Sequence, residues 1–353
     1  MREQSNSNQC FCLCGSGLPY EVCCKNKINP YESEITKKVF LAELDRLRKN
    51  YKRVCLYPNQ SECSHMIHAH TISQKAVLSK IAHNGRVLMP VANGPANLFD
   101  MQEVGIEARA SKFYCFCKKH DSIFYPIDKE LPPLNEMTYF LYAYRIFAYT
   151  YYKIKRELDC FEKLKQKYDV TSNLVALEMY KETAADFLQL EVLKNTFDTA
   201  ILTPNYDCLT NTVVTMDYKV NFAAAVCFCP VVDIFGNWIE RKGQYPLVYV
   251  TVIPHELQSR ILISWLKNDN STFDNFRTQI ETVPRRFLTK YLNNLLPLNC
   301  ENMTLNPLLW DKWGTAAQLD FKKMAYRYLN NPYIKVLSKT YFQKREYDLF
   351  LVI

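Results

Sequence analysis

Apolar positions along the chain follow two different periods, and together they predict a mixed fold. Helical spacing of apolar residues is found over residues 33–53, 74–82, 135–167 and 173–196, and again in three segments after residue 270. Alternating or continuous apolar runs, which are typical of strands, occupy residues 67–72, 86–92, 212–222, 223–232, 247–253 and 260–265. We therefore expect an α+β fold whose larger, C-terminal part combines helices with an antiparallel sheet of about four strands.

The predicted helix at residues 33–53 has an apolar stripe and a basic face. The stripe is formed by Ile35, Val39, Phe40, Leu44, Leu47 and Tyr51. The rest of the helix carries Lys37, Lys38, Arg46, Arg48, Lys49, Lys52 and Arg53. We interpret the basic face as the solvated side of a helix that packs on a core. A helix that contacts phosphates is the alternative.

The cysteines and histidines are concentrated near the amino end. Of the 14 cysteines and 6 histidines, nine and five respectively lie within the first 120 residues. No apolar segment has the length of a signal peptide core or of a membrane span, which predicts a cytoplasmic protein that does not enter a membrane. In that reducing compartment, clustered cysteines indicate metal binding more often than disulfides. The net charge of +8 is compatible with an anionic partner without requiring one.

The first cysteine cluster has the composition of a small zinc site. Its sequence is Cys12-Leu-Cys14-Gly-Ser-Gly-Leu-Pro-Tyr20-Glu-Val-Cys23-Cys24. Two close pairs of thiolates suit tetrahedral zinc, and a segment this short needs the metal in order to fold. The pattern resembles the SEC-C motif, C-x-C-G-S-G-x-x-Y-x-x-C-[CH], at every fixed position. The resemblance implies structural zinc on Cys12, Cys14, Cys23 and Cys24, and an adaptor that docks on protein or ribosomal partners.

The second cluster predicts another structural zinc site. Cys55 and Cys63 form a loop around a proline, and Cys117-x-x-His120 has the spacing of a metal knuckle that opens a helix. We expect Cys55, Cys63, Cys117 and His120 to hold this ion. Cys115 is the alternative for Cys117, and His70 is the alternative for Cys55.

The segment between these two knuckles carries the candidate chemistry. Residues 67–72 alternate as a strand does, which places His68 and His70 on the same face. A two-ligand loop, a strand with a histidine and a knuckle at a helix start resemble the HNH, or ββα-metal, nuclease family. Ala69-His70-Thr71-Ile72 corresponds to its D-H-I, with alanine replacing the acidic residue, and the residues from Phe116 to Asp121 correspond to its L-C-x-x-C-H. The strings AHTIS, L..IA.NG.V and FC.KHD..F also resemble poorly characterised bacterial proteins.

This resemblance implies metal-dependent hydrolysis of phosphodiester bonds in DNA or RNA. His70 would be the general base, Asp121 would hold Mg²⁺ or Mn²⁺, and His68 would help to bind the metal or a phosphate. A nuclease joined to an unfamiliar domain also suggests a bacterial toxin or an antiviral defence effector. Two alternatives stay open at this point. One is an HNH-derived scaffold without activity, and the other is a zinc-stabilised adaptor that binds protein or ribosomal partners.

The chain is expected to divide into three parts. Residues 1–30 form the SEC-C-like zinc motif, and residues 31–134 form the HNH-like zinc domain with its leading basic helix. Residues 135–353 form the larger α+β domain, which carries no phosphate-binding loop or nucleophile elbow.

Both clusters together predict the metal content of the full chain. Elemental analysis of the purified protein is expected to find about two zinc ions per chain, because each set of four ligands closes one tetrahedral site. A content of one ion or none would contradict the assignment of the clusters.

Overall fold

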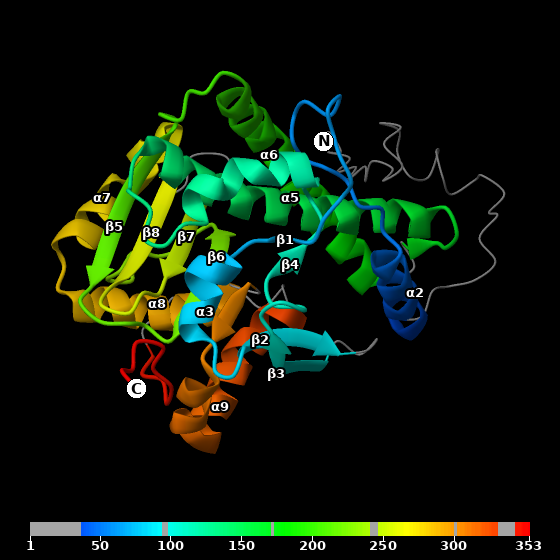
Figure 1. Ribbon diagram of the computed structural model, residues 1–353. Coiled ribbons are helices and arrows are strands. Elements are labelled where there is room, and N and C mark those ends of the chain that lie inside the picture. Colours follow the sequence, from blue (N-terminus) through cyan, green and yellow to red (C-terminus); the bar gives the residue numbers. More distant parts are fainter. Residues whose placement is uncertain (1–36, 94–97, 171–172, 241–245, 300–301, 331–342) are drawn as a thin grey trace, which may run out of the picture. The chain divides into compact units, whose positions relative to one another are not determined.

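The computed structural model describes residues 37–93, 98–170, 173–240, 246–299, 302–330 and 343–353 (Figure 1). The described residues form two compact units. One contains residues 37–50 and 157–184, and the other contains residues 51–156 and the described part of 185–353. The boundary expected at residue 134 therefore lies inside the second unit. The SEC-C-like motif lies outside the described residues.

The first unit is built on the predicted basic helix, α2 (Lys37–Lys49). Phe40 is fully buried and stacks on Phe161, with 5.7 Å between the ring centres. Arg48 donates hydrogen bonds of 2.6 to 2.8 Å to both carboxylate oxygens of Glu157. Two further ion pairs on this helix are Arg46–Glu43 and Lys49–Asp45. Three of the seven basic residues of the predicted face, Arg46, Arg48 and Lys49, are thus paired with carboxylates.

The second unit contains an antiparallel sheet that is larger than the four strands expected. Its described strands are arranged in the order β3-β2-β9-β6-β7-β8-β5. They are β2 (Arg86–Asn93), β3 (Leu98–Gly105), β5 (Leu209–Met216), β6 (Phe222–Phe228), β7 (Val248–Ile253), β8 (Ser259–Leu266) and β9 (Met303–Leu305). The hairpin β2–β3 joins the sheet through β9. The strand predicted over residues 212–222 was wrong, because β5 ends at Met216 and β6 begins at Phe222.

Helices cover both faces of this sheet, as Figure 1 shows for its central strands. Parts of α5 (Glu136–Lys165) and α6 (Leu174–Leu202) share one core with Ala225 and Tyr249 of the sheet. The opposite core contains Val250 and Trp265 and is closed by α7 (Asn270–Thr282), α8 (Arg285–Asn299) and α9 (Pro307–Asn330). Alternate strand residues thus enter opposite cores, as the pleat requires. None of the described helices is both long enough and apolar enough to cross a lipid bilayer.

A short two-stranded ribbon lies apart from the main sheet. Strand β1 (Ala69–His70) pairs antiparallel with β4 (Lys112–Phe113), so only two residues of the strand predicted over 67–72 are in a ladder. After β1 come the π-helical turn η1 (Gln74–Leu78) and α3 (Ser79–Ile81), where one continuous helix was expected. After β4 come α4 (Lys118–Asp121) and the 3-10 helix η2 (Ser122–Ile127).

Hydrogen bonds of Ser111 link this ribbon to the main sheet. Its backbone has a φ of 56°, and its hydroxyl accepts a hydrogen bond of 2.8 Å from the backbone of Ile72. The same hydroxyl lies 3.2 Å from the side-chain oxygen of Asn302. Asn302 in turn donates from its side chain to the carbonyl of Ala225 in β6. The end of β1 is therefore fixed relative to the central sheet.

The burial of Trp265 predicts a large contribution to stability. Trp265→Ala removes a fully buried indole that also donates a 3.0 Å hydrogen bond to Asn270. We expect the free energy of unfolding to fall by about 3–5 kcal/mol, as measured by denaturant titration. The matched control is Trp238→Ala, since Trp238 is 68% exposed and its removal should change stability by less than about 0.5 kcal/mol.

Candidate metal centre and active-site pocket

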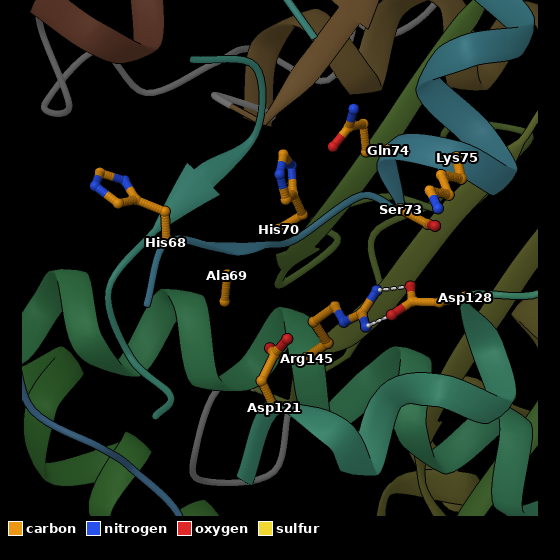
Figure 2. A pocket seen from close by; sticks show the side chains of 9 residues that line it. All are labelled: His68, Ala69, His70, Ser73, Gln74, Lys75, Asp121, Asp128 and Arg145. Carbon is orange, nitrogen blue, oxygen red and sulfur yellow. Dashed lines mark hydrogen bonds and ion pairs between the residues drawn. The ribbon is translucent and has the colours of Figure 1, made fainter. Parts of the chain in front are cut away.

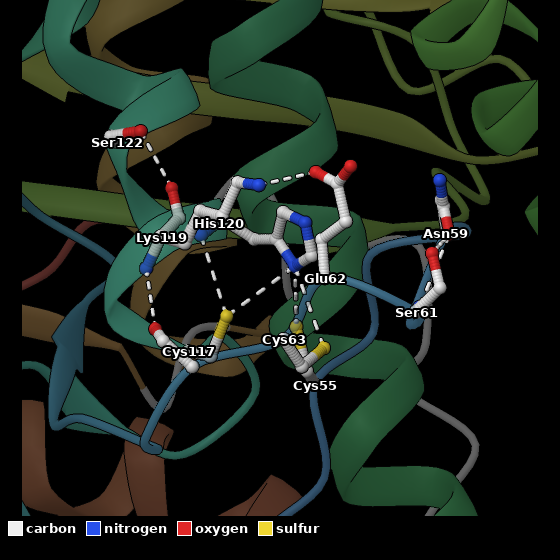
Figure 3. Close-up of polar contacts among 10 residues, drawn as sticks. Cys55, Asn59, Ser61, Glu62, Cys63, Cys117, Lys119, His120 and Ser122 are labelled. Carbon is white, nitrogen blue, oxygen red and sulfur yellow. Dashed lines mark hydrogen bonds and ion pairs between the residues drawn. The ribbon is translucent and has the colours of Figure 1, made fainter.

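The four predicted ligands of the second zinc site lie together in the structure. The ligand atoms of Cys55, Cys63, Cys117 and His120 are all within 4.8 Å of one another. Figure 3 shows the three sulfur atoms around the ring of His120. The distances from its Nδ1 atom to the Sγ atoms of Cys55, Cys63 and Cys117 are 3.5, 3.6 and 3.4 Å.

These distances match the edge of a zinc tetrahedron. Zn–S bonds of about 2.3 Å and Zn–N bonds of about 2.0–2.1 Å place tetrahedral sulfur and nitrogen ligands about 3.6 Å apart. All three sulfur–nitrogen distances fall close to that value. The ring of Tyr57 stacks on His120, with 4.0 Å between ring centres and 12° between planes, and so fixes the imidazole orientation. The donor set and its geometry therefore fit a closed, structural zinc ion.

Local backbone contacts bring the two knuckles together. The backbone amide of Leu56 donates to the carbonyl of Cys115 at 2.9 Å, and the backbone amide of Lys118 donates to the carbonyl of His65 at 3.0 Å. Burial acts to raise the pKa of the Cys117 thiol, but hydrogen bonds with the backbone of His120 and Ser64 outweigh it and lower that pKa to about 7. A thiol with this pKa is readily available as a thiolate ligand.

The structure also decides between the alternative ligands. Cys115 is fully buried, burial raises the pKa of its thiol well above the usual value, and it is not part of the four-residue cluster. His70 lies in a separate pocket and does not replace Cys55. The other predicted ligands, Cys12, Cys14, Cys23 and Cys24, lie outside the described residues.

A cavity of about 190 Å³ gathers the three candidate catalytic residues. Its lining residues, drawn in Figure 2, are His68, Ala69, His70, Ser73, Gln74, Lys75, Asp121, Asp128 and Arg145. His70 belongs to β1, His68 directly precedes this strand, and Asp121 is the last residue of α4. A water molecule takes up about 30 Å³ in the liquid, so the cavity has room for several waters or for a phosphate group.

His70 is held as a neutral imidazole. Burial, followed by the nearby positive charge of Lys112, lowers its pKa to about 4, while a hydrogen bond with the backbone of Ala110 acts in the opposite direction. Its Nδ1 atom is buried and has no hydrogen-bond partner among the described residues. The unprotonated ring nitrogen can accept a hydrogen bond, and it lies just beneath the accessible surface.

An ion pair on the cavity wall was missed by the sequence analysis. Buried Arg145 donates hydrogen bonds of 2.8 and 2.9 Å to the two carboxylate oxygens of Asp128. Its guanidinium also lies 4.3 Å above the ring of Phe124, and its Nε atom has no partner in the described structure. The signal in the sequence was the single charged residue within the apolar stretch of residues 137–152.

Asp121 adds a second carboxyl group to the cavity. Burial raises its pKa, although the charge of Arg145 acts to lower it. Within the described residues, only the Cys/His cluster brings three ligand atoms within 4.8 Å of one another.

Comparison of the chain with protein-family models, curated proteins and solved structures finds no match.

Two neighbouring cysteines provide a matched test of the metal centre. Cys117→Ala removes one of four ligands, so the zinc content should fall by about one ion per chain. Cys115→Ala removes a buried thiol outside the cluster, so that protein should keep all of its zinc. Equal zinc contents in the two variants, measured by elemental analysis, would contradict the assigned ligands.

Proposed function

We propose that the protein is an HNH-like, metal-dependent nuclease that hydrolyses phosphodiester bonds of DNA or RNA. The observation that carries this proposal is the cavity beside the zinc-type cluster, where His70 and Asp121 line one space. A general base and a carboxylate ligand for a cation are the two groups that such a hydrolysis requires.

The order of the local elements supports the resemblance to ββα-metal nucleases. Strand β1 carries His70, β4 pairs with it, and α4 follows directly after Cys117. The long insertion between the two strands contains the hairpin β2–β3, which joins the main sheet instead of interrupting the ribbon. The ribbon and helix are therefore compatible with a compact ββα unit.

His70 is the proposed general base. Its unpartnered Nδ1 accepts the proton of the attacking water, while the hydrogen bond with the backbone of Ala110 fixes the ring. His68 lines the same cavity, and in this proposal it would contact a phosphate oxygen. The ammonium group of Lys75, which also lines the cavity, offers a further donor to the phosphate.

Asp121 is the proposed ligand of a divalent cation. Its carboxylate is a hard oxygen donor of the kind that Mg²⁺ and Mn²⁺ prefer. A bound cation would stabilise the negative charge on the phosphate and on the leaving oxygen. Zinc has a separate role in this proposal, because the closed cluster holds α4 and thereby Asp121 in place.

Removing the imidazole of His70 tests the proposed activity. Plasmid DNA and RNA are incubated with the protein and Mg²⁺ or Mn²⁺, with and without a chelator. The wild type should cut at least one substrate, and His70→Ala should lower the rate by about 10²–10⁴-fold. His83→Ala, at an exposed histidine outside the cavity, is the matched control and should cut normally. Both variants should keep the zinc content of the wild type.

Substrates that stay intact with every metal would contradict the nuclease and favour the zinc-stabilised adaptor. Cutting that His70→Ala leaves unchanged would instead remove His70 from the mechanism.

The lowered pKa of His70 predicts the pH dependence of the proposed reaction. A base must be unprotonated to work, and the profile of kcat/KM reports the pKa of the free enzyme. The acidic limb of this profile should therefore lie well below 6.5, the ordinary histidine value, and approach the pKa of about 4. An acidic limb centred near the ordinary histidine pKa of 6.5 would show that the free enzyme does not hold His70 in a buried, neutral form.

A further inference from the structure

A stack of three side chains lies at one edge of the catalytic cavity. The guanidinium carbon of Arg53 lies 4.0 Å from the centre of the Tyr114 ring. The Tyr114 ring contacts His68, with 3.9 Å between ring centres and 53° between planes, and its hydroxyl group hydrogen-bonds to the Nε2 atom of His68. Because His68 also lines the cavity, the stack is continuous with the proposed active site.

Rigid elements hold these side chains in place. His68 directly precedes β1 and Tyr114 directly follows β4, so the ribbon sets their separation. Arg53 precedes the metal ligand Cys55 by two positions, which ties its backbone to the cluster. A guanidinium group is planar by resonance, and contact with an aromatic face holds it in position. Arg53 is nevertheless exposed, so its plane is accessible to a ligand.

The surroundings of the stack are positively charged. Burial, and then the charges of Lys112 and Arg53, lower the pKa of His68. Among the described residues, no carboxylate lies within ion-pair distance of Arg53 or Lys112, and the guanidinium group of Arg53 contacts the Tyr114 ring instead. In the part of the chain that the structure describes, the ammonium group of Lys112 donates to the backbone carbonyl of Glu107. An uncompensated positive charge next to an exposed planar group favours an anionic, aromatic ligand.

We propose that the Arg53–Tyr114–His68 stack binds an unpaired base next to the phosphate in the cavity, and that the substrate is single-stranded nucleic acid. Bases of single strands stack on aromatic rings and on arginine planes, whereas those of a duplex are enclosed between their neighbours. This inference rests on the proposed nuclease function and names its substrate class. RNA and DNA share the required chemistry, and the 2′-hydroxyl group distinguishes them.

Binding is measured separately from cutting. The full-length His70→Ala protein is titrated against fluorescein-labelled oligonucleotides of one mixed sequence, as single-stranded RNA, single-stranded DNA and DNA duplex, and anisotropy is recorded. In the His70→Ala background, Arg53→Ala removes both the planar guanidinium group and its charge. Arg53→Lys keeps the positive charge but has no planar group. Arg285→Ala removes an exposed arginine from α8, which packs in the opposite core, and is the matched control for lost charge.

We expect at least one single strand to bind more tightly than the duplex. Arg53→Ala and Arg53→Lys should each weaken that binding about tenfold, because the stacking contribution is lost in both. Arg285→Ala should leave it nearly unchanged. Three results would overturn the proposal. The duplex binds as tightly as the single strands or more tightly, the Arg53→Lys variant binds like its parent, or no oligonucleotide binds.

The two proposals fail in different ways. If single strands bind through Arg53 but the wild type cuts none of them with any metal, the nuclease fails and the base-binding stack stands. If the wild type cuts nucleic acid but Arg53→Lys binds and cuts like the wild type, the stack fails and the nuclease stands.

Discussion

The clustering of three thiols and one imidazole constrains the proposed active site more than any other contact. Burial raises the pKa of the Cys55 thiol to about 12, and a cation bound among these residues would stabilise its thiolate form. Cys55 and Cys63 lie more than 50 residues before Cys117 in the chain, so a shared ion would link an early loop to the start of α4. Asp121 ends that helix. An ion in this cluster would therefore help to fix the position of Asp121, which is not one of its four ligands.

The other wall of the cavity depends on the main sheet. Ser111 connects the end of β1 to Asn302, and Asn302 contacts the backbone of Ala225 within β6. His70 thus belongs to a ribbon that is fixed on one side by the sheet and on the other by the metal centre. Such double support is what a catalytic constellation needs, because small displacements of its groups lower the rate strongly.

Sequence periodicity predicted the parts of this fold that depend on local burial. Helices α5 and α6 and strands β7 and β8 lie close to their expected positions, since each buries a regular apolar face. Periodicity does not specify which strands pair, so the entry of β2 into the main sheet was missed, and β3 was not predicted as a strand. The zinc ligands of the second cluster were predicted by residue type and spacing. Asp128 and Arg145 were not, because their pairing joins two elements that only the folded chain brings together.

The charges of the cavity indicate why cation and substrate would bind together. At neutral pH the lowered pKa of His70 keeps it uncharged, and the carboxylates of Asp121 and Asp128, when ionised, are balanced by Arg145 and Lys75. A divalent cation alone would leave this small space with excess positive charge, and a phosphodiester alone would leave it negative. Each therefore makes the other's binding more favourable. The phosphate would also raise the pKa of His70 towards neutrality, which strengthens it as a base once substrate is present.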